Sequence, residues 1–203
     1  MKTNEVLLNG QFINLRLLDL NDAELTLSWR LSKRARYLNA GAQSVEDQKR
    51  WISSRPSSEF NFIIELKNGL SVGMISLIDI NNNHRRAEPA RFLIGNEIAV
   101  QGVPAAAEAE KLLFKFAFDE LELLRIYGTV AANNTKMITW NKFLGMKEEG
   151  RLRNHLFLDG KLMDAVFLGL LEPEYRKITT PRLESLLQSL KSKNHQLLRS
   201  PVV

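Results

Sequence analysis

The hydrophobic pattern along the chain alternates between strand-like and helix-like segments. Short runs rich in β-branched and aromatic residues predict strands, whereas apolar residues three or four positions apart predict helices. The predicted strands are residues 12–17, 61–66, 70–79, 86–94, 125–130, 146–152 and 163–171. The predicted helices are residues 22–30, 44–54, 105–121 and 135–143, and residues 31–42 are predicted as a loop or short helix.

Glycine and proline mark the turns between these elements. Asn68-Gly69 supplies the positive φ that a tight hairpin turn needs, and Gly145 follows a predicted helix at its C′ position. Pro89 lies inside a predicted strand and therefore demands an edge position, a bulge or a distortion. The order of elements predicts a mixed α/β fold, with one central, mostly antiparallel sheet and helices on both faces.

Length and composition favour one domain with an extension. The chain has 203 residues, and its 44% hydrophobic content is sufficient for a proper core. We expect a domain over residues 1–175 and a helical tail over residues 176–203. The lack of cysteine excludes disulfides, thiolate metal sites and cysteine nucleophiles. No run suits a membrane span and the start does not resemble a signal peptide, so a cytoplasmic location is expected.

The net formal charge of +5 comes from the tail. Six of the 28 Lys and Arg residues, but only one of the 23 Asp and Glu residues, follow residue 175. The remaining chain is formally neutral, so we expect no nucleic-acid partner. In the tail, a basic helix beginning at Thr180-Pro181 carries an apolar stripe of Leu183, Leu186, Leu187, Leu190 and Leu197. This stripe must be covered by the protein body, by a second subunit in a homodimer or by a membrane surface, and we expect them in that order.

The predicted helix start at Ala105 has the properties of a phosphate site. Small residues keep its first turn thin, and a helix start offers unpaired N–H groups and a partial positive charge. The hexapeptide Gln101-Gly102-Val103-Pro104-Ala105-Ala106 resembles the Gln/Arg-x-x-Gly-x-Gly/Ala signature by which GNAT-superfamily acetyltransferases hold the pyrophosphate of acetyl-CoA. Pro104 stands where that family usually has glycine. The alternative is a helix start whose small residues only allow close packing.

The resemblance to the GNAT superfamily extends over residues 12–175. The matching stretches are Phe12–Arg16 with Asp22, Val72–Leu77, Ala87-Glu88, Asn134–Met137 through Phe143–Met146, and Glu149–Arg153 with Gly160 and Asp164. They are most similar to a subgroup containing ribosomal-protein alanine N-acetyltransferases and acetyltransferases of nucleotide-linked amino sugars. Trp29-Arg30 and Arg91–Gly95 resemble the sugar-modifying members most. The implied activity is direct acetyl transfer from acetyl-CoA to a primary amine.

The resemblance also implies which residues hold acetyl-CoA. The expected contacts are Ile98, Ala99, Val100, Gln101, Gly102, Val103, Ala105, Ala106 and Asn134. Backbone N–H groups of residues 98–100 would polarise the acetyl carbonyl, unless this segment is only a loop. Asn134 would face the pantetheine arm, and it also fits an ordinary helix N-cap.

Two residues are predicted to be catalytic. Glu88 would help to deprotonate the amine, because only a neutral amine can attack; the alternative is a solvated strand residue beside Arg85 and Arg86. Asn141 occupies the position where many relatives place a tyrosine that protonates the departing CoA thiolate. An amide has no useful proton at neutral pH, so water or another group serves, or the step is unassisted.

The acceptor is expected near Trp29, Arg30 and Arg34, where Lys33 and Arg36 add positive charge. Such a cluster suits the diphosphate of a nucleotide-linked amino sugar, although basic residues are also common at helix ends. The alternatives are a protein N-terminal acetyltransferase and a degenerate GNAT fold that binds CoA or a protein without catalysis. The histidines are widely spaced along the chain and no metal is expected.

Overall fold

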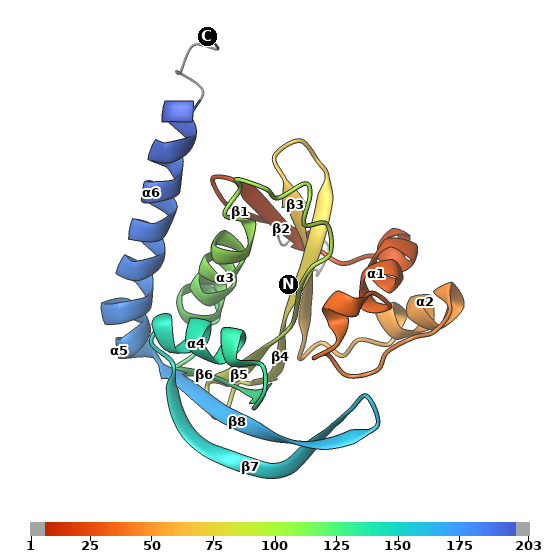
Figure 1. The fold of residues 1–203 in the computed structure, drawn as a ribbon. Coiled ribbons are helices and arrows are strands. Elements are labelled where there is room, and N and C mark those ends of the chain that lie inside the picture. Colours follow the sequence, from red (N-terminus) through yellow and green to blue (C-terminus); the bar gives the residue numbers. More distant parts are fainter. Residues whose placement is uncertain (1–6, 198–203) are drawn as a thin grey trace.

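The structure is a computed structural model that describes residues 7–197, with side chains as far as residue 191 (Figure 1). A single eight-stranded sheet forms its centre, with strand order β1-β2-β3-β4-β5-β6-β8-β7. Neighbouring strands are antiparallel except β5 and β6, which are parallel. The strands are β1 (Leu7–Asn9), β2 (Ile13–Leu17), β3 (Phe60–Leu66), β4 (Ser71–Asn81), β5 (Arg86–Ile94), β6 (Arg125–Ala131), β7 (Lys147–Leu158) and β8 (Lys161–Leu171).

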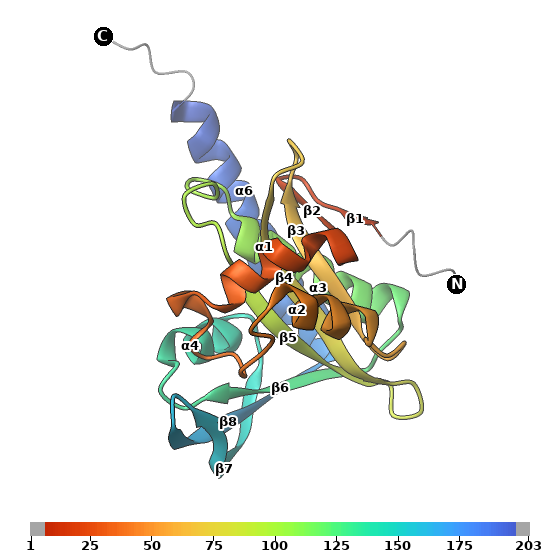
Figure 2. The same cartoon turned by 90° about the vertical axis from the view of Figure 1, so that its right-hand side faces the viewer.

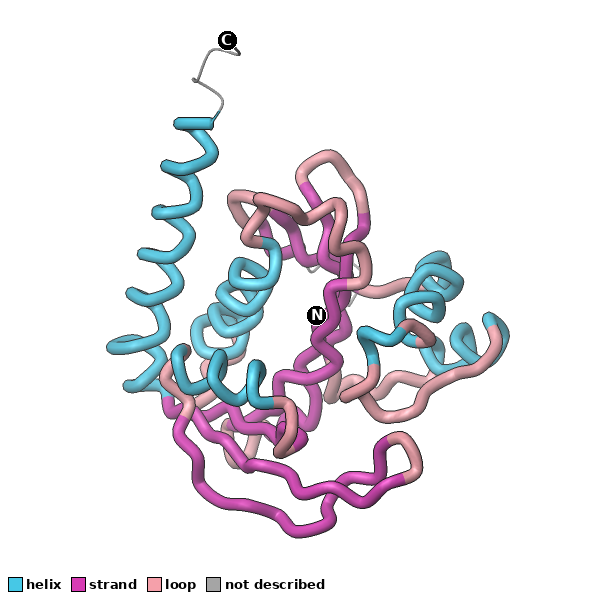
Figure 3. Tube along the Cα trace, in the orientation of Figure 1, coloured by secondary structure: helices cyan, strands magenta, loops and turns pink. Residues whose placement is uncertain are grey.

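Helices cover both faces of this sheet. The α-helices are α1 (Ala23–Arg30), α2 (Val45–Ser53), α3 (Ala105–Lys115), α4 (Thr135–Phe143), α5 (Glu172–Glu174) and α6 (Thr180–Leu197). Short 3-10 turns are η1 (Leu20–Asp22) and η2 (Lys33–Ala35), and π-helical turns are η3 (Phe116–Glu120) and η4 (Tyr175–Thr179). Figure 3 shows α1 and α2 on one side of the strands and α3, α4 and α6 on the other, and Figure 2 views the α1/α2 side directly. The predicted mixed α/β fold is therefore confirmed.

Local sequence signals account for several boundaries. The Ser44 hydroxyl accepts the N–H of Asp47 at 3.1 Å and thus caps α2. Gly69 has a φ of 84° in the β3–β4 turn, as the Asn-Gly pair predicts. Gly145 has a φ of 99°, and the Met146 N–H donates to the carbonyl of Asn141 at 3.0 Å, which is the bond expected at a glycine-ended helix.

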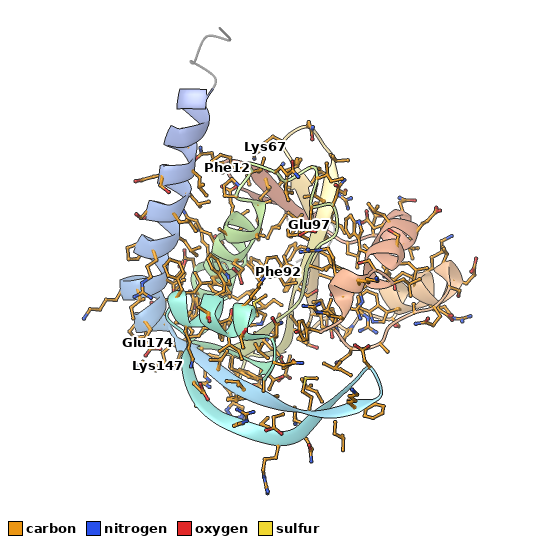
Figure 4. All side chains as sticks on the ribbon, viewed as in Figure 1. Phe12, Lys67, Phe92, Glu97, Lys147 and Glu174 are labelled. Carbon is orange, nitrogen blue, oxygen red and sulfur yellow. The ribbon has the colours of Figure 1, made fainter. Side chains whose placement is uncertain are left out.

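The hairpin of β7 and β8 is longer than the sequence predicts. Pairing continues to Leu158 and Lys161 around the turn at Asp159-Gly160, beyond the predicted strands at residues 146–152 and 163–171. Only Leu158 is buried in β7, so this strand lacks the apolar periodicity from which a strand is recognised. Lys147 forms an ion pair with Glu174 at 2.6 Å, which links β7 to α5 (Figure 4).

The C-terminal helical segment begins earlier than predicted. Helix α6 begins at Thr180, as predicted, but helical structure already starts at Glu172, with Pro173 in its first turn, and runs through η4 into α6. Pro181 has no N–H to donate, and the wider π-helical turn directly precedes it.

Helix α6 packs along α3 (Figure 1). Leu183 and Leu187 are buried in the main core, which confirms that the protein body covers this part of the apolar stripe. Lys111 of α3 lies 3.6 Å from the Glu184 carboxylate of α6. The side chain of Leu197, predicted to belong to the stripe, lies outside the described side chains. Within residues 7–197, no helix combines the length and apolar content needed to cross a membrane.

A buried carboxylate connects α3 to the first hairpin. Glu108 is only 3% exposed, and it accepts the backbone N–H groups of Gln11, Phe12 and Ile13 at 2.6, 2.6 and 2.8 Å. A buried charge needs such compensation, because leaving it unpaired costs several kcal/mol. Glu108 therefore fixes the N-terminal end of the sheet against the helix whose first turn is predicted to bind phosphate.

Candidate active site

The site begins where β5 and β6 part. These strands pair only at Arg86 with Arg125 and at Ala87 with Ile126, whereas β6 stays paired with β8 along its whole length. Arg91 has a φ of 53°, and the β4–β5 register shifts there by one residue. Such a bulge bends a strand, so β5 turns away from β6 and leaves an open edge. The distortion expected near Pro89 thus falls two residues later.

A cavity of about 970 Å³ lies at this opening. Its volume is at the upper end of the range of about 300–1,000 Å³ usual for small-molecule sites. Figure 4 labels Phe92, which is one of its lining residues on β5. The charged and polar lining residues used below are Arg30, Arg34, Glu88, Arg91, Glu110, Tyr127, Asn134, Asn141 and His155.

The start of α3 has the properties predicted for a phosphate site. The first intrahelical bond runs from the Glu108 N–H to the Pro104 carbonyl at 3.0 Å, so the N–H groups of residues 105–107 have no acceptor within the helix. The Pro104 side chain at the N-cap makes no capping hydrogen bond. Ala106 is exposed and lines the cavity, whereas Ala105 is fully buried in the core.

The loop before α3 is less open than predicted. Residues 97–102 form a turn, and Ala99, Val100 and Val103 pack against the main core. The Ala99 N–H donates to the Asn96 side chain at 3.1 Å, so it is already engaged and not directed at a ligand. Ile98 has 81% of its surface exposed. The cavity-lining set does not include residues 98–103, Gln101 and Gly102 among them.

Glu88 lies at the fork between the strands. It lines the cavity, and a Cβ added at Gly128 of β6 would come within 3.5 Å of its Oε1. Burial raises the pKa of Glu88 and nearby Asp79 adds to this, while a hydrogen bond from the Thr129 backbone and the charge of Arg91 oppose it. Glu88 is therefore a half-buried carboxyl inside the site, unlike the solvated strand residue considered as its alternative.

Helix α4 supplies the facing wall. Asn134 caps this helix, accepting the Met137 N–H at 3.4 Å as expected, and it also lines the cavity. Asn141 lines the cavity two turns later. Trp140 precedes Asn141, and its indole Nε1–H donates a hydrogen bond to the carboxyl of Glu110 on α3.

Sequence reasoning missed Glu110 and Tyr127. Burial raises the pKa of Glu110 to about 8, with the Trp140 hydrogen bond opposing this. Burial raises the pKa of Tyr127 to about 12, and its hydroxyl donates to Asp79. Neither residue carries a signal in the local sequence, because both pKa shifts arise from burial by other elements of the fold.

The three predicted acceptor residues have different surroundings. Trp29 is 6% exposed and packs against Gly95 in a core cluster, outside the cavity lining. Arg34 lines the cavity, donates to the Ile94 carbonyl at 2.9 Å and forms an ion pair with Glu97, so its charge is already compensated.

Arg30 has no such compensation. It lines the cavity, and its guanidinium donates to the carbonyl of Asn39. Burial and the nearby charge of Arg91 lower its pKa, and in the described part of the chain no carboxylate pairs with it. Arg91 itself is paired with Glu59 at 2.9 Å. Among the described residues, no three His, Asp or Glu side chains gather to form a metal site.

Comparison with known proteins agrees with this geometry. A family model described as "Acetyltransferase (GNAT) domain" matches residues 13–147. A spermidine N(1)-acetyltransferase of Escherichia coli K12 is 33% identical over 58% of this chain and 61% of that protein. YdaF of Bacillus subtilis, whose name assigns it provisionally to ribosomal N-acetylation, is 36% identical over 54% of this chain and 58% of its own. The chain thus spans about three-fifths of the length of these relatives.

Solved structures extend the likeness of fold over most of the chain. A protein from T. thermophilus, provisionally described as an acetyltransferase, matches with a TM-score of 0.75 and 26% identity over 92% of this chain and 100% of its own. Mutant forms of the spermidine/spermine N-acetyltransferase SpeG from Vibrio cholerae match with a TM-score of 0.71 and 23% identity over 83% and 98%. On the family match, the chain belongs to the GNAT acetyltransferase domain family.

Proposed function

We propose that this protein transfers the acetyl group of acetyl-CoA directly to the primary amine of an anionic acceptor, and we favour a nucleotide-linked amino sugar. The observation that carries the acceptor class is Arg30, a partly buried guanidinium in the cavity wall beside Arg91 and without a carboxylate partner among the described residues. Uncompensated positive charge in a partly enclosed site favours an anionic ligand. A phosphate group of the acceptor would match it through charge-assisted hydrogen bonds.

Acetyl-CoA fits the other features of the cavity. The unpaired N–H groups of residues 105–107 suit its pyrophosphate, although Pro104 removes one potential donor. The open edge of β5 offers backbone groups to the amides of the pantetheine arm, as an exposed strand edge does for any extended partner. Asn134 lines the same cavity from α4. Residues 101–103 remain proposed contacts for the pyrophosphate, although they lie outside the cavity lining. The engaged Ala99 N–H weakens the proposal that residues 98–100 polarise the acetyl carbonyl.

Glu88 is suited to accept the proton of the attacking amine. An ammonium group must lose one proton before or during attack, and a carboxylate of raised pKa is a better base than a fully solvated one. Its position at the fork, against Gly128, directs it into the space between the diverging strands. Asn141 has no proton to give and is better regarded as a wall residue than as an acid.

The names of the relatives raise spermidine and ribosomal-protein amines as other acceptors. Spermidine is a polycation, and the uncompensated charge of Arg30 in the cavity wall opposes it. A basic protein N-terminus meets the same repulsion. The remaining alternative is a CoA-binding module without catalysis, which predicts acetyl-CoA binding but no thiol release with any amine.

The test is a thiol-release assay with a matched panel of acceptors. The panel contains a UDP- or TDP-linked 4-amino-dideoxy sugar, spermidine and short N-terminal alanyl peptides, and we expect the nucleotide sugar to react fastest. Arg30→Gln should raise the KM for that sugar about 10- to 100-fold, which corresponds to one lost charge-assisted hydrogen bond. The control Arg50→Gln removes an exposed arginine of α2 that forms an ion pair with Asp47 of the same helix, and should change nothing.

The outcomes separate the candidate functions. Fastest turnover of spermidine or of the peptide, or an unchanged KM in Arg30→Gln, would refute the anionic acceptor. Thiol release from no member of the panel, together with acetyl-CoA binding by calorimetry, would favour the binding module.

A further inference from the structure

Acetyl transfer needs a proton donor as well as a base. When the amine nitrogen bonds to the acetyl carbon, the carbon–sulfur bond breaks and CoA leaves as a thiolate, which must gain a proton. Asn141, on the wall where a donor is expected, has none to offer at neutral pH. A side chain that supplies this proton must therefore be a different group of the cavity, with water as the alternative donor.

Most of the other titratable groups in the cavity are unsuited to this step. The Tyr127 hydroxyl is already donated to Asp79, and its pKa of about 12 makes it a weak acid. Tyr37 also lines the cavity, but its hydroxyl donates to the Asn133 carbonyl at 3.4 Å in an exposed hydrogen bond. His155 is exposed on β7, at the outer end of the hairpin. Glu88 has the opposite task of accepting the amine proton. Glu110 is the carboxyl that remains among the described lining residues.

Glu110 is held between the two helices that flank the cavity. On α3, Ala106, Glu110 and Phe114 are spaced by four residues and all line the cavity. With a rise of 1.5 Å per residue, Glu110 lies about 6 Å along the helix from Ala106, the lining residue nearest the unpaired N–H groups. From α4, Trp140 donates to its carboxyl, and the next residue is Asn141. Glu110 and Asn141 thus line the same cavity from α3 and α4.

The surroundings of Glu110 favour the neutral acid. The residue is 5% exposed, and no described Lys or Arg forms an ion pair with it. Burial disfavours the charged form and raises the pKa to about 8, close to that of a thiol, so proton exchange between the two is nearly balanced. A structural carboxylate would instead be compensated, as Glu108 is by three N–H groups.

We propose that Glu110 is the general acid of this enzyme and donates its carboxyl proton to the departing CoA thiolate; the assignment rests on the proposed acetyl transfer. As the carbon–sulfur bond breaks, its electron pair stays on sulfur, which takes the proton and becomes CoA thiol. Glu110 is left as a carboxylate. The ammonium form of the acceptor loses two protons in all: Glu88 passes the first to solvent before the attack and takes up the second as the amide forms. Proton exchange with solvent then returns Glu110 to its neutral acid and Glu88 to its carboxylate, so the cycle needs no other reactant.

The first experiment compares Glu110→Gln with the wild type. Gln keeps an oxygen to accept the Trp140 N–H but has no acidic proton, so packing is retained. We expect kcat to fall about 10- to 100-fold at unchanged KM, the low end of general-acid effects, because a thiolate is a good leaving group. We also expect the decline of wild-type kcat above about pH 8 to disappear. Glu120→Gln, an exposed change in the adjoining η3 turn, is the control.

A second variant tests the acid independently of packing. Asn141→Tyr supplies a phenol on the facing wall, and we expect it to restore kcat at least tenfold in the Glu110→Gln background. A purely structural Glu110 predicts the same gain from Asn141→Tyr in the wild-type and Glu110→Gln backgrounds and no change in the pH profile, and either result would overturn the assignment.

A third measurement does not depend on turnover. In protein labelled with ¹³C at glutamate carboxyls, one resonance, absent from Glu110→Gln, should titrate near pH 8 in the protein without ligand. Titration close to the ordinary glutamate value of 4.5 would overturn the proposal. If the wild type acetylates no amine, the proposed function fails. The carboxyl titration, together with an ultraviolet titration of the thiol of bound CoA, still decides whether Glu110 is a neutral acid beside that thiol.

Discussion

The indole of Trp29 lies so close against Gly95 that a Cβ added to the glycine would fall 2.2 Å from the indole Cγ. Gly95 directly follows β5, and the Trp29 side chain belongs to the core cluster beneath it. We expect Gly95→Ala to lower the free energy of unfolding by about 1–3 kcal/mol, because a well-packed core resists an added methyl group. Urea denaturation measures this.

Gly150→Ala is the matched control for that change. Gly150 lies on β7 with no atom within 4 Å of an added Cβ among the described residues, so its replacement should alter stability by no more than about 0.5 kcal/mol. Equal effects of the two substitutions would contradict the tight contact between Trp29 and Gly95.

Glu88→Gln should abolish base assistance without disturbing the fold. We expect kcat to fall about 100-fold or more. If Glu88 is the base, as proposed, wild-type activity requires its carboxylate, so kcat/KM should rise as pH increases through the raised pKa of this residue. In Glu88→Gln, this rise of kcat/KM with pH should disappear. Glu65→Gln, a partly exposed change on β3 away from the cavity, should keep the wild-type profile. A Glu88 variant with the wild-type pH dependence would argue against its role.

Glu110 should make stability depend on pH. Its pKa is about 8 in the folded chain against 4.5 for an ordinary glutamate, so the folded state holds a proton that the unfolded state has lost within this window. The free energy of unfolding should therefore fall, relative to Glu110→Gln, by about 1.4 kcal/mol per pH unit between these values. The stabilising contribution is fully present below pH 4.5 and lost above pH 8. Urea titrations of both proteins at several pH values measure the difference, and parallel curves would contradict the raised pKa.

The C-terminal helix should contribute to the stability of the domain. Leu183 is fully buried against the core, so Leu183→Ala should cost about 2–5 kcal/mol. Ser185→Ala, an exposed change on the same helix, should have little effect. If both variants unfold at the same urea concentration, α6 does not pack on α3 in solution.

The fold was largely predictable because most strands are buried on at least one face. Strands β3 and β4 show this in their apolar runs, and Asn68-Gly69 identifies the turn between them. The hairpin of β7 and β8 was predicted too short, since its outer half is held by backbone pairing while its side chains are exposed. Strand β1 was missed because three residues, Leu7–Asn9, carry no periodicity.

The site was predictable only in part. Glu88, Asn134 and Asn141 were found by family resemblance, and all three line one cavity. Trp29 was assigned to the acceptor, yet an aromatic residue at a helix end is equally suited to the core position it has. Glu110 was missed because its significance depends on Trp140, 30 residues away, and on burial from both helices. Burial of this kind is a tertiary property that no local pattern encodes.

The brief pairing of β5 with β6 divides the sheet mechanically. Strands β1 to β5 form one unit and β6, β8 and β7 another, and the ladder between the two units spans only two consecutive residue pairs in the described sheet. An extended ligand seated in the opening would complete the ladder as an additional strand. Hydrogen exchange along β6 should therefore slow when acetyl-CoA binds, because the co-substrate supplies backbone pairing that the polypeptide leaves unmade.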